Sequence, residues 1–540
     1  MPQLVDLFGY LSLVFRAGVL IFQSLLLGGT LFLLWIASPR PDNATDSLAA
    51  LRSDSSRLLR MSAIGLALIQ GISLYIDSVI LMTATGMHLR DVIGANFFVA
   101  GSCILVAAVC VFFIAGVAAN IRVLTLPLLL VVILSASVMT SHAASRLTGR
   151  PLLIALTCLH QTATGFWIGG LPFLMFAMFR VKETKLQWYL ASRFSRVALA
   201  SVVVLLVSGL AMSTLYIEPL KAVLGTAYGV MVTAKAAMLG VLVALGGINF
   251  LLLRNRTETA IPKLRRIVEA ELGIGITVIL AAVSLTSQPP AVDLADNVVP
   301  FQTILARLTP TWPRFTYSVP ITAARAGNLN RGSTEDSTVK VVDSEPLSYK
   351  RLADIAESEA NHHWMGVIVL AIGVLALLAR TGKAEWAGYW PLLLIGISIF
   401  ILIRADTESW PYGRQGFWAA ALDPEVFQHR LVALACAGFA VFELHARKRR
   451  PENNRLALIF PIMCALAGAV MLTHSHSLLN VKEEVLAELS HVPLAILAVL
   501  AGWSRWLEVR LPASNRQIVS WIWPVCFVLV GAQLLNYREM

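Results

Sequence analysis

Long apolar runs recur along almost the whole chain, and they restrict its fold more than any other feature does. The clearest example runs from Pro151 to Phe179 without a single Asp, Glu, Lys or Arg. Hydrocarbon offers no hydrogen-bond partners, so runs of this length cross a bilayer as helices that satisfy their own backbone groups. Only 14% of the 540 residues are charged, against about a quarter in soluble proteins. The sequence therefore predicts an all-α, polytopic helical integral membrane protein.

The apolar runs predict about fourteen transmembrane helices, counted as segments long enough to span hydrocarbon. We expect them at roughly residues 17–38, 61–84, 95–119, 123–143, 152–179, 195–216, 228–253, 267–287, 363–380, 388–404, 428–446, 457–476, 489–507 and 518–536.

Lys and Arg residues gather in alternate loops between these runs. Basic loops stay on the cytoplasmic side, so this alternation predicts that both termini lie outside, in the periplasm. The same rule accounts for the net charge of +11 by topology in a lipid bilayer, so the charge does not call for a nucleic-acid partner.

A long polar segment divides the predicted helices into two groups. Residues 288–361 are rich in Pro, Thr, Ser, Asn and Gly, which is typical of a linker. The sequence thus predicts a membrane domain of about eight helices at 1–287, a periplasmic loop at 288–361, and a membrane domain of about six helices at 362–540.

The predicted topology places nearly all histidines on one side of the membrane. All ten except His445 fall in the outer half: His88, His142, His160, His362, His363, His429, His474, His476 and His491. Imidazole is the commonest ligand for transition metals, and thioether adds a preference for Cu(I). Methionines such as Met139 and Met471 accompany some of these histidines. The pattern indicates a soft or borderline metal, with copper ahead of zinc.

His160 lies inside the long apolar run, about eight residues or roughly 12 Å from its outer end. An ionisable side chain at membrane depth predicts a functional site, because hydrocarbon cannot solvate it. The alternative is a neutral imidazole that only joins two helices by a hydrogen bond. As the deepest of the outer histidines, His160 is a candidate for a step along a path rather than for the first docking site.

The densest histidine cluster is C-terminal, at Thr473-His474-Ser475-His476. These two imidazoles diverge on a regular helix, so joint binding requires the helix to end or unwind there. Glu488 precedes His491 by three residues and Glu425 precedes His429 by four. Each carboxylate could orient its imidazole as a second partner. The alternative is that both glutamates only cap helix N-termini.

Two other charged residues fall at membrane depth. Lys235 lies at about the depth of His160, and Asp77 lies near Tyr75 at a similar outer depth. Lys235 could regulate charge in a permeation path beside His160, or its ammonium could simply extend to the surface.

Several motifs together resemble one known family. They are Leu159-His160, Phe166-Trp167-Ile168-Gly169-Gly170-Leu171, Arg193-Phe194-Ser195-Arg196-Val197-Ala198, Ser208-Gly209-Leu210, and Ala227-Tyr228-Gly229 with Lys235 and Gly247-Ile248-Asn249. In this order they resemble the membrane domain of the copper-resistance protein D (CopD/PcoD) family, over about residues 1–287.

The resemblance implies a bacterial inner-membrane protein that handles copper, often beside a periplasmic copper-binding partner of the CopC type. It implies uptake toward the cytoplasm, and it carries His160 over by motif. The last six predicted helices extend beyond the family's core, so their role depends on the histidine pattern alone.

We therefore expect a copper transporter rather than an enzyme. The sequence lacks Walker A, aspartyl-phosphate and CxxC motifs, which argues against ATP-driven pumping. The alternative is a membrane redox protein with quinone as electron partner, in which His474 or His476 pairs with His429 or His491 to hold a b-type haem. A scaffold or assembly role with incidental histidines is a third interpretation.

Overall fold

In the structure, a computed structural model, the chain folds into helices. It describes residues 2–39, 46–117, 119–255, 260–317, 349–405, 409–411, 413–420, 424–447, 455–473 and 481–538. No strand forms within these ranges apart from one isolated bridge between Ser409 and Gln415. The chain divides into two compact units: residues 1–298 with 469–475, and residues 299–468 with 476–540. The boundaries predicted at 288 and 361 stay a prediction.

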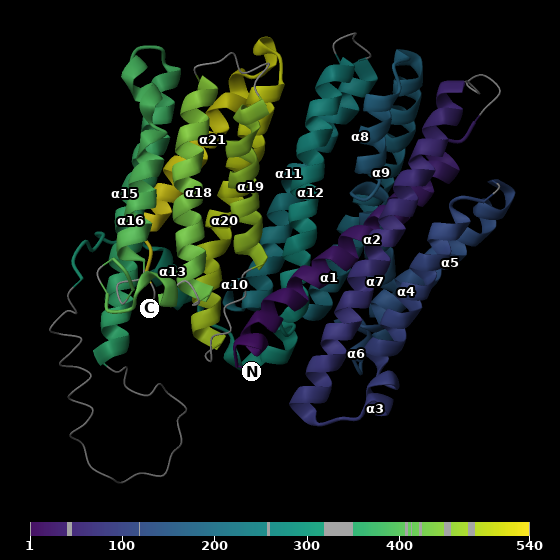
Figure 1. The fold of residues 1–540 in the computed structure, drawn as a ribbon, viewed down its shortest axis with the longest axis horizontal. Helices are drawn as coiled ribbons and strands as arrows, with labels where there is room; N and C mark the ends of the chain where they lie inside the picture. The colour runs from purple at the N-terminus through teal and green to yellow at the C-terminus, as the bar shows by residue number, and fades with distance from the viewer. Residues whose placement is uncertain are drawn as a thin grey trace. The chain divides into compact units, whose positions relative to one another are not determined.

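In the first unit the helices lie side by side and are joined by short connections (Figure 1). They are α1 (Pro2–Leu31, continued by a π-turn at Phe32–Ile36), α2 (Asp46–Thr85), α3 (Leu89–Ile93), α4 (Asn96–Ile114), α5 (Ala119–Met139), α6 (His142–Ser145), α7 (Arg150–Trp167), α8 (Leu171–Arg180), α9 (Thr184–Tyr216), α10 (Ala222–Gly225), α11 (Ala227–Asn255) and α12 (Ala260–Ser287).

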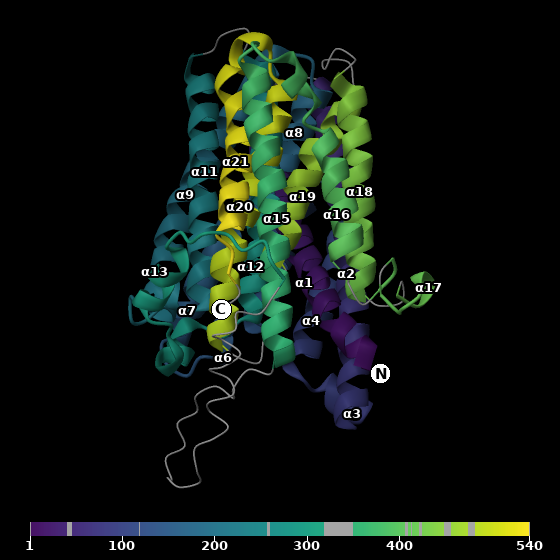
Figure 2. The same ribbon diagram turned by 90° about the vertical axis from the view of Figure 1, so that its left-hand side faces the viewer.

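The second unit pairs α15 with α21 and α16 with α18 (Figure 2). Its helices are α13 (Phe301–Leu308), α15 (Tyr349–Arg380), α16 (Leu392–Arg404), α17 (Phe417–Ala420), α18 (Pro424–Arg447), α19 (Ile459–Thr473, whose last residues group with the first unit), α20 (Val481–Arg510) and α21 (Gln517–Leu535).

Thirteen helices of the described residues are long and apolar enough to cross a membrane. A shorter apolar helix, Leu456–Leu472, forms where the sequence predicts a fourteenth span at 457–476. The prediction of an all-α polytopic membrane protein is therefore confirmed. The side on which the termini lie stays a prediction.

Close backbone contact fixes α1 against the junction of α7 and α8. The apolar run predicted as one helix at 152–179 is interrupted by a turn at residues 168–170. A Cβ atom at Gly169 would lie 1.8 Å from the Ser24 carbonyl oxygen, and one at Gly28 would lie 2.2 Å from the Gly169 carbonyl carbon. Because apolar surface gives no net drive to pack in lipid, such small-residue contacts are what hold membrane helices together.

The second unit has an aromatic core around Trp390, Phe460 and Trp523. Beside it, Arg380 donates two hydrogen bonds to the Glu508 carboxylate, at 2.8 and 2.9 Å, and the Trp523 indole donates a third at 2.7 Å. A buried carboxylate without a cation is costly, so this bidentate pairing locks α15, α20 and α21 together.

Candidate functional site

A cavity of about 460 Å³ lies inside the first unit, walled by α1, α7, α9, α11, α12 and residues 141–143. Its wall on α12 runs from Thr286 back to Gly275, a distance of about 16 Å along the helix. That is roughly half of a hydrocarbon core. The polar or sulfur-bearing side chains that line it are Gln23, Ser24, Ser141, His142, Thr157, His160, Gln161, Thr164, Met212, Ser213, Tyr216, Tyr228, Lys235 and Thr286.

His160 enters this cavity from α7, and α9 fixes its orientation. Its Nδ1 lies 3.0 Å from the Ser208 hydroxyl oxygen, and that hydroxyl donates its own proton to the Val204 carbonyl at 2.6 Å. Ser208 can therefore only accept from Nδ1–H, which leaves the lone pair of the neutral imidazole on Nε2. Nε2 has no hydrogen-bond partner among the described residues. His160 thus presents an available nitrogen ligand at membrane depth.

Two neighbours modify the chemistry around His160. Met212 lies one helical turn beyond Ser208, and its sulfur accepts a hydrogen bond from the Thr157 hydroxyl at 3.6 Å. Lys235 extends from α11 into the same cavity, close enough for its charge to repel a protonated His160. The cavity therefore combines a nitrogen donor, a thioether and one cationic side chain. The role of Lys235 stays a prediction, and Met212 was not among the predicted site residues.

His142 occupies one end of the cavity, on α6. Its Nε2 lies 3.0 Å from the Thr286 carbonyl oxygen, so Nε2 is the donor of a neutral ring and Nδ1 keeps the lone pair. Burial lowers the pKa of His142 below its usual value, which keeps the ring neutral at neutral pH. Arg16 donates to the Thr286 hydroxyl at 3.1 Å.

Asp77, the other charged residue predicted at membrane depth, lies on α2 and accepts a hydrogen bond from the Ser73 hydroxyl at 3.1 Å.

One turn deeper than Gly275, α12 carries the buried carboxylate of Glu271, 3% exposed. The Trp167 indole donates to Oε1 at 2.6 Å and the Asn249 amide donates to Oε2 at 2.7 Å. No cation pairs with Glu271 among the described residues. Trp167 also lines the cavity, so this triad closes its inner end. Glu271 is not among the site residues predicted from the sequence, although its charge at the start of the predicted span 267–287 is a visible signal.

Glu271→Ala is expected to destabilise the protein by about 2–5 kcal/mol, because two buried N–H donors lose their acceptor. Glu271→Gln should cost about 1 kcal/mol or less. The Asn249 Oδ1 atom has no partner among the described residues and can accept from the new amide after a flip. Chemical denaturation in detergent measures both variants, and equal losses would contradict the role of the triad.

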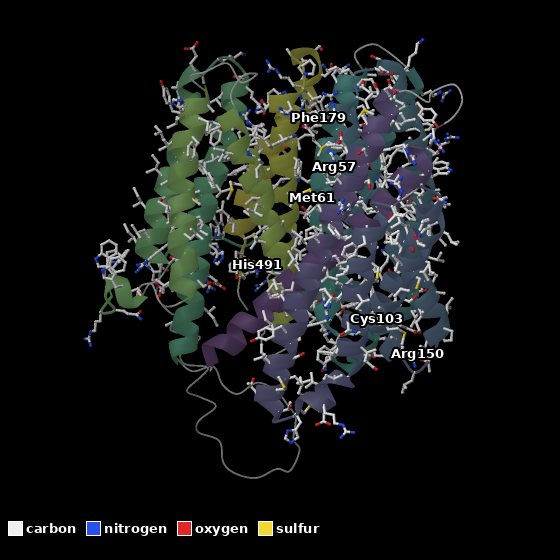
Figure 3. All side chains as sticks on the ribbon, turned by 45° about the vertical axis from the view of Figure 1, so that its right-hand side comes forward. Arg57, Met61, Cys103, Arg150, Phe179 and His491 are labelled. Carbon is white, nitrogen blue, oxygen red and sulfur yellow. The ribbon has the colours of Figure 1, made fainter. Side chains whose placement is uncertain are left out.

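In the second unit, two of the predicted histidines meet around Tyr537. The His362 ring stacks on Tyr537 with centroids 3.9 Å apart, and the His491 ring meets it edge-on at 6.0 Å. Each histidine lies with Nδ1 2.8 Å from a carbonyl oxygen one turn earlier on its own helix, Ser358 for His362 and Ala487 for His491. The structure thus brings together residues of α15 and α20, and Figure 3 shows His491 on the latter.

His363 has a different environment, with both ring nitrogens occupied by backbone groups. Its Nδ1 lies 2.8 Å from the Arg314 backbone nitrogen and 2.7 Å from the Arg314 carbonyl oxygen, and its Nε2 lies 2.9 Å from the Tyr537 carbonyl oxygen. It joins α15 to the segment after α13 and to the end of α21. This geometry indicates that His363 has a structural role, because it connects these three segments.

The other predicted residues are spread over the described part of the chain or lie outside it. His88 is exposed just before α3, Met139 is exposed on α5, His429 and Met471 are half-buried on α18 and α19, and Glu488 is buried on α20. His474, His476 and the side chain of Glu425 lie outside the described residues. Within the described ranges, no three His, Cys, Asp or Glu side chains group closely enough to hold a metal ion. The roles of these residues stay predictions.

Comparison with known proteins points to copper. The sequence model of the copper resistance protein D family matches residues 189–285. The chain is also 34% identical over 160 residues to the copper transport protein CutJ of Bacillus subtilis (strain 168). This alignment spans 29% of the chain and 29% of that relative. No solved structure matches the chain.

These matches confirm the predicted resemblance to the CopD family. The family match covers most of α9, all of α11 and most of α12, and so includes Ser208, Lys235, Asn249 and Glu271. His160 and Trp167, on α7, lie before the matched residues. The match therefore includes the serine that orients His160 and two of the three residues of the Glu271 triad.

Proposed function

We propose that this chain is a bacterial inner-membrane copper transporter whose first unit carries copper ions from the periplasm toward the cytoplasm. The copper ion is the substrate. It enters the cavity at His142, passes His160 and Met212, and leaves past the triad of Trp167, Glu271 and Asn249. Passage of the copper ion needs no covalent step, so we propose a transporter and not an enzyme.

The geometry of His160 supports this proposal most directly. A neutral imidazole held by Ser208 with its Nε2 lone pair available, in a cavity that also contains the Met212 thioether, is the donor set that soft copper ions prefer. A metal-binding histidine commonly donates its other ring N–H to an oxygen atom that fixes its tautomer. Ser208 provides that oxygen atom. The relatives named for copper resistance and copper transport support the choice of metal.

Delivery of copper to the cavity belongs to the same proposal. The CopD resemblance suggests a periplasmic copper-binding protein of the CopC type as the donor. The histidines of the second unit, with His362 and His491 around Tyr537, would provide an intermediate binding surface.

The decisive test is transport by the purified full-length chain in liposomes. Wild-type protein is expected to move copper into the vesicles faster than Zn²⁺ and much faster than Mg²⁺, because imidazole and thioether ligands discriminate in that order. Copper flux no greater than in protein-free liposomes would contradict the proposal. A Soret band in the purified protein would instead favour the redox alternative. No contact of the described residues supports that alternative.

Lys235→Gln is expected to increase the affinity of the first unit for copper by about tenfold or more. Removal of one positive charge beside the ion relieves a repulsion on the order of 1–3 kcal/mol at an effective dielectric constant of about 20. Copper bound at equilibrium, measured by elemental analysis, provides the readout. Lys221→Gln is the matched control, since Lys221 is exposed and lies outside the cavity. Equal gains in both variants would exclude a specific role for Lys235.

A further inference from the structure

A second hollow of the first unit, about 620 Å³ in volume, lies where α2 begins and where α4 meets α5. Among the described residues, four arginines line it, Arg52, Arg57, Arg60 and Arg122, together with a single carboxylate, Asp46. It has no lining residue in common with the cavity of His160. It therefore requires an explanation of its own.

Two of these arginines are held in place by uncharged groups. Arg52 donates to the Leu33 and Ala37 carbonyls at 3.1 and 2.7 Å, and Arg122 donates to the Ala115 carbonyl at 3.5 Å. Carbonyl oxygens orient a guanidinium but do not neutralise it. Arg52 and Arg122 are also close enough to repel each other. The backbone thus fixes two like charges across one hollow.

The other two arginines add to this excess of positive charge. The Arg60 guanidinium lies 4.4 Å from the centre of the Phe112 ring, and its buried Nε has no hydrogen-bond partner among the described residues. Arg57 is 3.2 Å from Asp54, but Asp54 is shared with Arg180 at 2.8 Å. One carboxylate therefore serves two arginines.

Topology explains why basic residues lie at this end of the helices. It does not explain why four guanidinium groups converge on one hollow with so little counter-charge from the described residues. Planar guanidinium groups match the tetrahedral oxygens of a phosphate by paired hydrogen bonds. A phosphate-bearing anion would supply this counter-charge.

The surroundings of the hollow identify the source of the phosphate. Met61 follows Arg57 by one turn on α2 and is 67% exposed, and Figure 3 shows both on the same face of the unit. Phe113, beside Phe112 on α4, is 63% exposed. Such side chains contact acyl chains when their helices cross a membrane. A ligand that carries both a phosphate and acyl chains would contact the arginines of the hollow and these exposed apolar side chains together.

We propose that this arginine pocket binds the phosphate headgroup of an anionic phospholipid, with the acyl chains along Met61 and Phe113. Pockets of this kind between transmembrane helices are suited to acidic lipid headgroups. The site is independent of the proposed copper path, so its test does not depend on copper transport.

Native mass spectrometry of the full-length protein, with phosphatidylglycerol or phosphatidylcholine added, tests the site. Wild type should bind phosphatidylglycerol far more strongly than phosphatidylcholine. In Arg60→Gln/Arg122→Gln the phosphatidylglycerol affinity should fall about 30-fold, since each basic residue contributes about fivefold. Arg254→Gln is the matched control, because Arg254 is an exposed arginine on α11 outside the pocket, and its affinity should stay unchanged.

A single exposed variant covers the case in which the double variant does not fold. Arg57→Gln removes a side chain that is 74% exposed, and it should still lower phosphatidylglycerol affinity about fivefold. Equal lipid affinities in wild type, Arg57→Gln and Arg254→Gln would overturn the proposal. Inorganic phosphate is the second arm. If phosphate alone binds as tightly as the lipid and displaces it, the pocket is a free-phosphate site and the lipid assignment is wrong.

Discussion

His160→Ala is expected to reduce copper transport by the first unit at least 100-fold. The variant removes the nitrogen ligand that Ser208 orients toward the cavity, and the loss of a ligand should exceed the 10- to 100-fold cost of losing a partner that only orients one. Stability should fall by about 1 kcal/mol, the net value of one hydrogen bond. Copper flux into proteoliposomes and denaturation of the same samples separate the two effects.

Two further variants make this prediction specific. Ser208→Ala keeps the imidazole but no longer fixes which ring nitrogen carries the proton, so copper flux should fall about tenfold. His445→Ala removes an exposed histidine of α18 and should leave flux unchanged. If His160→Ala retains wild-type flux while its fold is intact, His160 is a structural hydrogen bond between α7 and α9, and the path lies elsewhere.

Gly169→Ala is expected to have the largest effect on stability, a loss of more than about 3 kcal/mol or a failure to fold. The new Cβ would lie 1.8 Å from the Ser24 carbonyl oxygen, a backbone atom that cannot move aside like a flexible side chain. The strain exceeds that of an overpacked core, about 1–3 kcal/mol. Denaturant unfolding in detergent and the yield of monodisperse protein are the measurements.

Gly240→Ala is the matched control, since a Cβ at that position on α11 meets nothing within 4 Å. Alanine is the better helix former by about 1 kcal/mol, so this variant should equal or exceed wild type in stability. Similar losses in both variants would show that the close contact of α1 with the α7–α8 turn does not support the fold.

The sequence predicts the helical membrane architecture well, because the need to satisfy the backbone in lipid leaves few alternatives. One detail differs for a local reason. The run at 152–179 is interrupted by a turn that contains Gly169, where the α1 backbone approaches too closely for any side chain. At the span predicted for 457–476, the described residues form the apolar helix Leu456–Leu472.

The candidate site could be predicted only in part. His160 is visible as an ionisable residue inside an apolar run, and Lys235 stands out for the same reason. Met212 and Ser208 give no such signal, because their role depends on which face of α9 meets α7. Glu271 has a charge that the sequence shows, but its two donors come from α7 and α11. Such pairings between distant segments follow from packing, and periodicity alone does not reveal them.

The histidine pattern of the second unit shows a different limit. The predicted topology puts His362, His363 and His491 on the same side of the membrane. The structure places His362 and His491 around Tyr537. It also gives His363 two backbone partners, which no count of histidines can anticipate. Residue type and depth therefore identify candidates, while the hydrogen bonds of each ring decide which nitrogen is available.

The close contact between α1 and the α7–α8 turn also determines where the first unit can deform. Backbone groups meet there without intervening side chains, so α1 and α7 form a rigid wall of the cavity that holds His160 at a fixed depth. On α11, the helix that carries Lys235, a Cβ at Gly240 or Gly247 would meet nothing within 4 Å, and the Asn249 amide joins this helix to Glu271 of α12. An ion that moves past His160 would therefore meet, on the side of α1 and α7, a surface whose position is set by backbone contact.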